Sequence, residues 1–218
     1  MDPWRPWRDA VVKLKLFVEG GGESKALRAE CREAFNTWLR GAGLQRFPRI
    51  VASGSRNDAF NDFKTALANG EAAMLLVDSE DRIAADYALG EPAKWLPWAH
   101  LKSRDGWDKP LDSADLDCHL MVQCMENWFL GDVDQLKKFF GQGFKDKKLP
   151  ATRPSLEATA KADVLAGLKL ASANCATKSP YGKGAHSFKI LKILDAKLII
   201  AAAPWAKRFA EEMQKRFP

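Results

Sequence analysis

Short apolar segments alternate with helical patterns at the start of this chain, and that alternation constrains the fold more than any other feature. Residues 11–18, 49–52 and 72–77 have the composition of strands, whereas residues 24–41 and 56–67 repeat apolar side chains at helical spacing. Strands that alternate with helices predict an α/β fold with a central parallel sheet flanked by helices. The segment 72–77 is apolar throughout, which is typical of a central strand covered on both faces.

The pattern is less regular after residue 90. Residues 90–115 are rich in proline and tryptophan, which predicts a long ordered loop. We then expect a strand at 119–125, a helix at 132–140, a basic loop at 141–154, a helix capped by Ser155 that extends to about residue 173, a glycine-rich basic turn at 178–186, and closing helices at 188–194 and 205–216. A length of 218 residues indicates one α/β core over 1–140, on which a basic helical extension, 141–218, packs without being an independent domain.

Charge is divided unevenly along the chain. Residues 1–136 carry 17 basic and 22 acidic side chains, a net −5, and residues 137–218 carry 17 basic and 6 acidic ones, a net +11. This division suits a metal ion bound by the acidic part and a polyanion bound by the basic part, although a solvated basic face has the same composition. We find neither a membrane-spanning apolar segment nor the apolar core of a secretion signal, so we expect a cytoplasmic protein that does not cross a membrane.

Acidic side chains stand where three of the predicted strands end. Glu19 follows the first strand, Asp78 and Glu80 follow the third, and Glu126 follows the strand at 119–125. The carboxyl ends of parallel strands border one crevice, and the alternating positions of Asp78 and Glu80 point both to one side of an extended chain. Carboxylates so close together need a cation, and their hard oxygens select Mg²⁺ or Mn²⁺. A single acid at a strand end is better explained by capping, but three strand ends favour a metal site.

The glycine triplet at residues 20–22 has a competing interpretation. Glycines before a helix can cradle a phosphate on their backbone N–H groups. Neither the lysine and serine ending of a P-loop nor the G-x-G-x-x-G spacing follows the triplet, so this signal is weak. A nucleotide-binding or phosphotransfer enzyme is therefore a third and weaker hypothesis.

The acidic strand ends resemble the two signature motifs of the Toprim domain, which topoisomerases, primases and OLD-family nucleases share. The first motif is Phe17-Val18-Glu19-Gly20 with Glu23, and the second, about sixty residues on, is Leu75-Leu76-Val77-Asp78-Ser79-Glu80-Asp81. Glu80 replaces the second aspartate of the family pattern and is one methylene longer. The resemblance implies a Toprim-like Rossmannoid core in the first 140 residues.

Three further segments resemble the domain of unknown function 4276 family, and this resemblance extends over nearly the whole chain. They are Arg104-Asp105-Gly106-Trp107 with Pro110, the run from His119 to Trp128 around Glu126, and the closing pattern around Lys183 and His186. The resemblance implies a Toprim-like fold, encoded beside ATPases in bacterial defence loci, with metal-dependent nuclease activity. It therefore also implies a partner ATPase of the ABC or AAA type.

Each acid and base has an expected role if the protein is a nuclease. Glu19, Asp78 and Glu80 are expected to hold Mg²⁺ or Mn²⁺, with Glu23 and Glu126 as ligands of a second metal or of the attacking water. Lys183, between two glycines, is the first candidate to neutralise charge on the phosphate, and Lys178 is the alternative. Contacts to the phosphate backbone of the nucleic acid are expected from the basic residues Lys145, Lys147, Lys148, Arg153, Lys178, Lys183 and His186.

Two hypotheses of different classes therefore lead. The first is a Mg²⁺-dependent nuclease that acts on DNA or RNA as an effector of anti-phage defence. The second is a non-catalytic Toprim-like module that docks on a partner ATPase and binds nucleic acid. A homo-oligomer is compatible with both hypotheses, and the sequence does not distinguish DNA from RNA or one metal from two.

Overall fold

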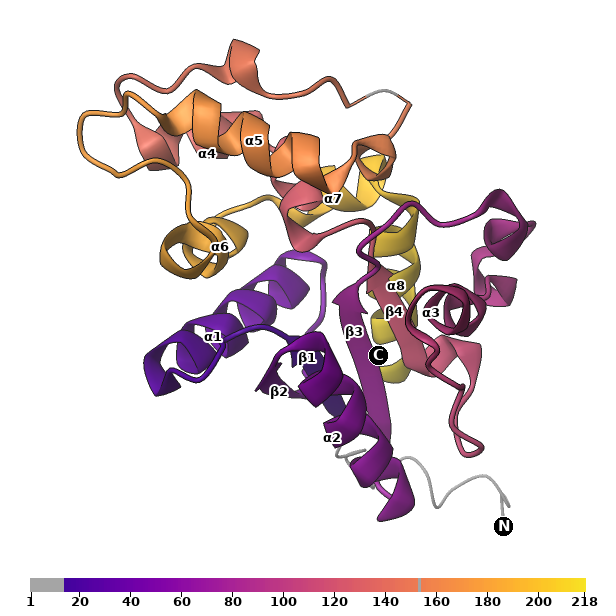
Figure 1. The fold of residues 1–218 in the computed structure, drawn as a ribbon. Helices are drawn as coiled ribbons and strands as arrows, with labels where there is room; N and C mark the ends of the chain where they lie inside the picture. Colours follow the sequence, from indigo (N-terminus) through magenta and orange to yellow (C-terminus); the bar gives the residue numbers. More distant parts are fainter. Residues whose placement is uncertain (1–13, 153) are drawn as a thin grey trace.

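A four-stranded sheet forms the centre of the computed structural model, which describes residues 14–152 and 154–218 (Figure 1). The strands are β1 (Lys15–Glu19), β2 (Arg49–Gly54), β3 (Ala73–Asp78) and β4 (Cys118–Met121), in the order β2-β1-β3-β4. Each neighbouring pair is parallel. The prediction of an α/β fold with a central parallel sheet is confirmed; residues 11–13 of the first predicted strand lie outside the described residues.

The order of the strands reverses between β1 and β3. Helix α1 (Lys25–Gly41) leads from β1 to the edge strand β2, and α2 (Arg56–Ala68) leads back past β1 to β3. Ser24 caps α1, and Ser55 caps α2 in a capping box with Asp58. In open α/β sheets, ligands bind in the crevice at such a reversal, outside the carboxyl ends of the strands.

Helices cover both faces of the sheet. Successive side chains of a strand point to opposite faces, so both faces present apolar side chains to the helices. Leu16 of β1 joins the apolar cluster that contains α1 and α8 (Pro204–Arg216), and its neighbour Phe17 joins the cluster that contains α2 and α3 (Pro97–Asp105). Trp38 of α1 stacks on Trp128 and on Phe209 of α8, with ring centroids 4.8 and 5.8 Å away. The C-terminal helix therefore builds the same core as the first helix.

Several elements differ from the sequence-based expectation. The predicted loop contains α3, in which Pro97 stands at the start and Gly106 ends the helix with φ +72°. Strand β4 stops at Met121, before the predicted end at residue 125, and the chain turns into η5 (Met125–Gly131), whose first N–H group donates to Asp78 Oδ1. Between η5 and α8 lie α4 (Val133–Phe140), α5 (Lys161–Ser172), α6 (Lys183–Leu191) and the unpredicted α7 (Ala196–Ala202).

Two helix starts were placed wrongly. Ser155 precedes a single 3₁₀ turn, and α5 begins only at Lys161, because Asn127 Nδ2 donates to the carbonyls of Leu156 and Thr159 and so holds that connection out of the helix. Helix α6 begins at Lys183, so the residues predicted as a basic turn supply its first turn. Among the helices of the described residues, none combines the length and the apolarity needed to cross a membrane.

Glu157, in the connection between α4 and α5, places a buried carboxylate against the start of α8. Its Oε1 accepts hydrogen bonds from the N–H groups of Trp205 at 2.9 Å and Ala206 at 3.4 Å. Burial raises the pKa of Glu157 to about 7, although these two N–H groups act in the lowering direction. A group whose pKa is raised by folding stabilises the protein below its unfolded-state pKa, and that contribution is lost as the pH rises through the folded-state value.

Glu157→Gln is therefore expected to become progressively more stable than the wild type as the pH rises. The amide keeps an acceptor oxygen and removes the charge, so the difference in free energy of unfolding should grow by about 2 kcal/mol between about pH 5 and pH 8. Urea unfolding of both proteins across this range measures the difference. A constant difference would mean that the Glu157 carboxyl ionises normally in the folded protein.

Candidate metal centre

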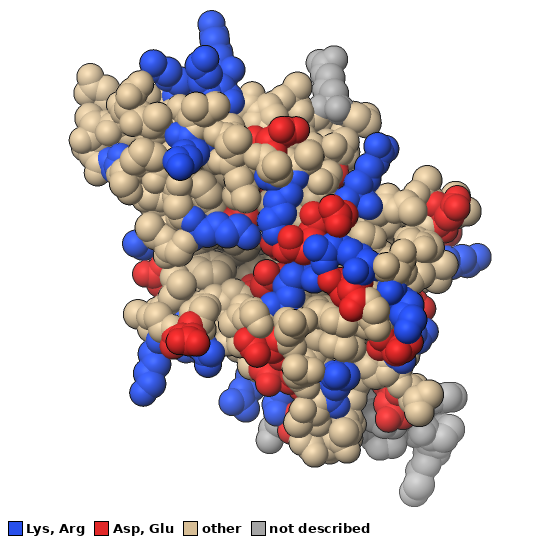
Figure 2. Space-filling view, in the orientation of Figure 1, with Lys and Arg blue, Asp and Glu red and all other residues tan. Residues whose placement is uncertain are grey.

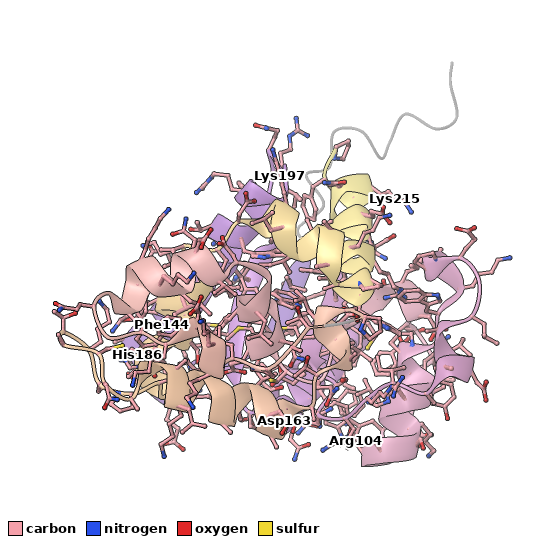
Figure 3. All side chains as sticks on the ribbon, turned by 90° about the horizontal axis from the view of Figure 1, so that it is seen from above. Arg104, Phe144, Asp163, His186, Lys197 and Lys215 are labelled. Atoms are coloured by element: carbon pink, nitrogen blue, oxygen red, sulfur yellow. The ribbon has the colours of Figure 1, made fainter. Side chains whose placement is uncertain are left out.

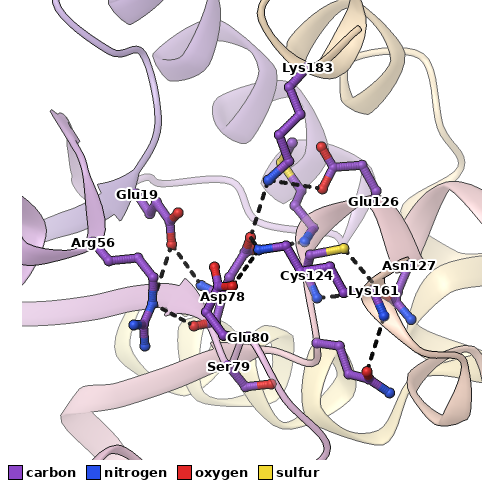
Figure 4. A network of polar contacts seen from close by, with 12 residues as sticks. Glu19, Arg56, Asp78, Ser79, Glu80, Cys124, Glu126, Asn127, Lys161 and Lys183 are labelled. Atoms are coloured by element: carbon purple, nitrogen blue, oxygen red, sulfur yellow. Dashed lines mark hydrogen bonds and ion pairs between the residues drawn. The ribbon is translucent and has the colours of Figure 1, made fainter. Parts of the chain in front are cut away.

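Three acidic side chains meet where the strand order reverses. Glu19 is the last residue of β1, Asp78 is the last residue of β3, and Glu80 follows two positions later. One carboxylate oxygen of each lies within 4.8 Å of the others (Figure 4). The structure thus brings together the three acids that the sequence predicted as metal ligands, which we call the acidic triad.

Glu80 reaches the triad by a sharp turn. Its φ of +66° is in the left-handed region, which non-glycine residues rarely adopt. The turn is tied to the chain after β4, because the Ser79 N–H donates to the Met121 carbonyl at 2.9 Å and the Glu80 N–H to the Gln123 carbonyl at 2.8 Å. We expected Asp78 and Glu80 to lie together because alternate side chains of an extended chain point to one side, and this explanation was therefore wrong.

Hydrogen bonds from the surrounding chain orient the triad. The Asp78 N–H donates to Glu19 Oε2 at 3.1 Å, and the Met125 N–H donates to Asp78 Oδ1 at 2.8 Å. Arg56 Nε donates to the Asp78 carbonyl at 3.0 Å and lies 3.7 Å from Glu19 Oε2. The guanidinium of Arg56 is itself held by Asp105 through two bonds of 2.8 and 3.0 Å. One oxygen of Asp78 and one of Glu19 are thereby fixed, which sets the direction of both carboxylates.

Two lysines border the triad, each at the first residue of a helix. Lys161 of α5 places Nζ 2.6 Å from Glu80 Oε2 and 3.8 Å from Asp78 Oδ2. Lys183 of α6 places Nζ 3.6 Å from Asp78 Oδ2 and 3.6 Å from Glu126 Oε2. The sequence predicted Lys183 through its flanking glycines. It gave no signal for Lys161, whose position depends on where α5 lies over the end of β3.

Glu126 lies beside the triad, and Lys183 pairs with both Glu126 and Asp78. Its carboxylate is fully buried, and Oε1 accepts hydrogen bonds from the Tyr181 hydroxyl at 2.7 Å and the Ser187 hydroxyl at 3.3 Å. Within the described part of the chain, Oε2 has no hydrogen-bond donor. The structure corrects the prediction for Glu23, which is exposed in the loop before α1 and is not among the acids that converge.

Burial and repulsion raise the proton affinity of the acids. Burial raises the pKa of Glu19, against the opposing effects of the Asp78 N–H and Arg56. Burial, followed by the charges of Glu19 and Glu126, raises the pKa of Asp78 well above its usual value. Burial alone would lower the pKa of Lys183, but the carboxylates of Glu126 and Asp78 outweigh it and raise that pKa. The raised pKa of Lys183 indicates that negative charge dominates around its ammonium group.

The charges around the triad do not balance. Arg56 is paired with Asp105, and Arg104, which lies 4.0 Å from Glu80 Oε2, is paired with Asp81, so these two arginines add no net charge to the group. Two ammonium groups then oppose four carboxylates, those of Glu19, Asp78, Glu80 and Glu126, so that two negative charges are in excess among the described residues when all four acids are ionised. This excess equals the charge of one divalent cation. The donors are all oxygen atoms, so the set fits Mg²⁺ or Mn²⁺.

The first two glycines of the triplet have a packing role that is independent of the phosphate cradle in the third hypothesis. The Gly20 N–H donates to the Gly54 carbonyl at 2.8 Å, and the Gly54 N–H donates back at 2.9 Å. A Cβ on Gly20 would lie 2.6 Å from the Phe188 ring, and one on Gly21 would lie 2.8 Å from the Arg28 Cα. Glycine is therefore required because α1 and α6 approach the loop closely.

The other lysines predicted to contact nucleic acid do not line the pocket beside the triad. Lys145, Lys147 and Lys148 are exposed in the segment between α4 and α5, and Figure 2 shows basic side chains toward the top of the molecule, where this segment runs in Figure 1. Lys178 Nζ lies over the Phe139 ring, 4.8 Å from its centroid. Arg153 lies outside the described residues.

His186 is buried, which corrects its prediction as a contact for nucleic acid. Its Nδ1 accepts a hydrogen bond from the Gly182 N–H at 3.1 Å and so closes the start of α6. The ring packs against Phe139 and Phe140, with centroids 5.8 and 5.6 Å away. Figure 3 shows His186 beside Phe144 and far from Arg104. The sequence gave no sign of this burial, because the aromatic partners belong to α4.

Comparison with known proteins identifies a family for nearly the whole chain. The model of the family described as domain of unknown function (DUF4276) matches residues 18–214, which include every residue of the acidic triad and both bordering lysines. No curated protein and no solved structure matches the chain significantly. Because the family model covers most of its length, the chain belongs to the DUF4276 family.

Proposed function

We propose that this protein is a Toprim-like, Mg²⁺-dependent nuclease that hydrolyses phosphodiester bonds of DNA or RNA. The observation that carries the proposal is the acidic triad, in which Glu19, Asp78 and Glu80 offer oxygens within 4.8 Å of one another at the reversal of strand order. The oxygen donors of the triad, and the two negative charges in excess when Glu126 and the two lysines are counted with it, suit one divalent cation. Hydrolysis of a phosphodiester needs an activated water and a stabilised leaving oxygen, and such a cation would supply both.

The residues of the chain have distinct roles in this proposal. The triad would hold the metal, and the hydrogen bonds from the Asp78 and Met125 N–H groups keep its carboxylates oriented before substrate arrives. Lys161 and Lys183 reach the triad from α5 and α6. Their ammonium groups are placed to neutralise negative charge that develops on a phosphate at the triad. Figure 2 shows this mixture of acidic and basic side chains across the middle of one face.

A second candidate is a non-catalytic module that docks on a partner ATPase and binds nucleic acid. One observation favours it: Lys161 already lies 2.6 Å from Glu80, so the lysines can serve as permanent counter-ions in place of a metal. The resemblance to defence proteins supports a role in anti-phage defence with an ATPase partner for either candidate. The two candidates differ in metal binding, which the nuclease requires and the module does not.

Cleavage assays with Glu19→Gln test the proposed activity. Purified protein, alone and with a partner ATPase, is incubated with plasmid DNA, single-stranded DNA and RNA in Mg²⁺ or Mn²⁺. We expect metal-dependent cleavage that falls about a hundredfold or more in Glu19→Gln, because a ligand charge is lost while the side-chain shape is kept. Glu211→Gln, a change at a half-buried position on α8, is the matched control and should cleave like the wild type. Equal activity in both variants, or none in any protein, would contradict the nuclease and favour the second candidate.

A further inference from the structure

A small pocket lies beside the acidic triad, between α1, α6 and the loop after β1. Its volume is about 170 Å³, and Glu19 and Asp78 stand at its edge. A cavity of about 150 Å³ accepts benzene in another protein, so this pocket has room for one six-membered ring. Figure 2 shows a hollow beside the band of charged side chains.

The walls of the pocket are apolar and firmly placed. Side chains of Leu27, Met121, Met125 and Phe188 line it together with several glycines. Phe188 is buried and packs so closely on Gly20 that no side chain would fit there. Apolar side chains and an aromatic ring favour a flat, weakly polar ligand such as a nucleobase.

Glu126 gives the pocket a hydrogen-bond acceptor that lacks a donor. Tyr181 and Ser187 both donate to Oε1, which fixes the orientation of the carboxylate. Oε2 is buried without a donor among the described residues, and the ammonium of Lys183, which also lines the pocket, lies 3.6 Å away (Figure 4). A buried acceptor without a donor is unfavourable, so a ligand that brings an N–H group to Oε2 would be favoured.

We propose that this pocket binds an unpaired cytosine base next to the phosphate that is cleaved. The size of the pocket suits a pyrimidine ring, and a glutamate accepts well from the exocyclic N4 amino group of cytosine. Thymine and uracil carry a carbonyl oxygen at that position, which Glu126 repels. This inference rests on the proposed nuclease, and it makes the substrate a single strand or a strand from which one base has been extruded, because a stacked base does not reach such a pocket.

Binding of short single strands tests the pocket separately from cleavage. Fluorescence anisotropy compares strands of cytosine with strands of thymine, and the RNA pair of cytosine and uracil, with Ca²⁺ in place of Mg²⁺. We expect the wild type to bind the cytosine strand of the preferred nucleic acid about tenfold more tightly. Cleavage of the same strands is then measured in Mn²⁺.

Two variants keep the proposal falsifiable. Leu27→Trp fills the pocket from the first turn of α1 and should abolish the preference for cytosine, whereas Leu111→Trp, a change at a fully exposed leucine, should keep it. Glu126→Gln should weaken the preference for cytosine strands about tenfold, which removes it. If Glu126→Gln does not fold, the result for Leu27→Trp alone tests the proposal.

The outcomes separate the pocket from the nuclease. Equal binding of cytosine and thymine or uracil strands by the wild type, or a preference that survives in Leu27→Trp, overturns the pocket even if the protein is a nuclease. A preference that Leu27→Trp removes supports the pocket even if no strand is cleaved, in which case only the proposed nuclease fails.

Discussion

Asp78→Asn is expected to lower metal-dependent cleavage by about a thousandfold while leaving the metal-free protein at least as stable as the wild type. Asp78 is the buried member of the triad, and Lys161 and Lys183 both approach its Oδ2. Asparagine keeps an acceptor for the Met125 N–H, so the hydrogen bond at 2.8 Å need not be lost. The substitution removes the charge that a bound cation requires.

The stability effect has a definite sign. Burial, Glu19 and Glu126 raise the pKa of Asp78 well above its usual value, so its ionised form is disfavoured in the folded protein. The stability that this raised pKa confers is present at low pH and is lost as the pH rises through the folded-state value. Near neutral pH, with metal chelated, the neutral asparagine should therefore unfold at the same temperature as aspartate or at a higher one.

Thermal unfolding with and without Mn²⁺ checks both parts of this prediction. The wild type should gain stability when Mn²⁺ is added, because a ligand that binds only the folded state stabilises it. Asp78→Asn should show little gain. Asp134→Asn, at a highly exposed position, is the control and should respond like the wild type. A full response to Mn²⁺ in Asp78→Asn would place the metal somewhere other than the triad.

The order of strands and helices was predictable because it depends on local periodicity. The segments around β1, α1, β2, α2 and β3 each carry their own apolar pattern, and their bounds agree closely with the structure. Glu19 was expected beside Asp78 and Glu80 because the carboxyl ends of parallel strands lie at one edge of a sheet. Predicting this therefore required no knowledge of which residues contact each other across the fold. The signals of α3 were also local, with Pro97 at its start and Gly106 at its end, but the surrounding tryptophans and prolines concealed them.

The partners of the triad were not predictable in the same way. Lys161 stands at the start of α5, and nothing local marks it as different from the other lysines of that region. The two-bond ion pair between Arg56 and Asp105 joins α2 to α3. The hydroxyl of Tyr181 donates to Glu126 from the connection between α5 and α6. Such contacts depend on how elements pack across the sheet, which a single sequence does not specify. Packing also placed His186 among aromatic rings instead of at the surface.

Lys161→Met is expected to change metal binding and cleavage in opposite directions. The ammonium of Lys161 lies 2.6 Å from Glu80 Oε2, so it competes with a cation for the triad's negative charge. Its removal should strengthen Mn²⁺ binding about tenfold, because one repulsive charge near the metal is lost. The phosphate would meanwhile lose a positive partner, so cleavage should fall about a hundredfold.

Calorimetric titration with Mn²⁺ and cleavage assays on the same preparations measure the two effects. Methionine keeps an unbranched chain of similar length, and Lys169→Met, an exposed change on the same helix, controls for the loss of a charge from α5. Tighter metal binding with unchanged cleavage would make Lys161 only a counter-ion of Glu80. Unchanged metal binding would show that the lysine and the metal do not share a site, and the charge argument for the triad would then be wrong. A gain in metal affinity together with a loss of cleavage is the combination that a permanent counter-ion in a non-catalytic module cannot produce.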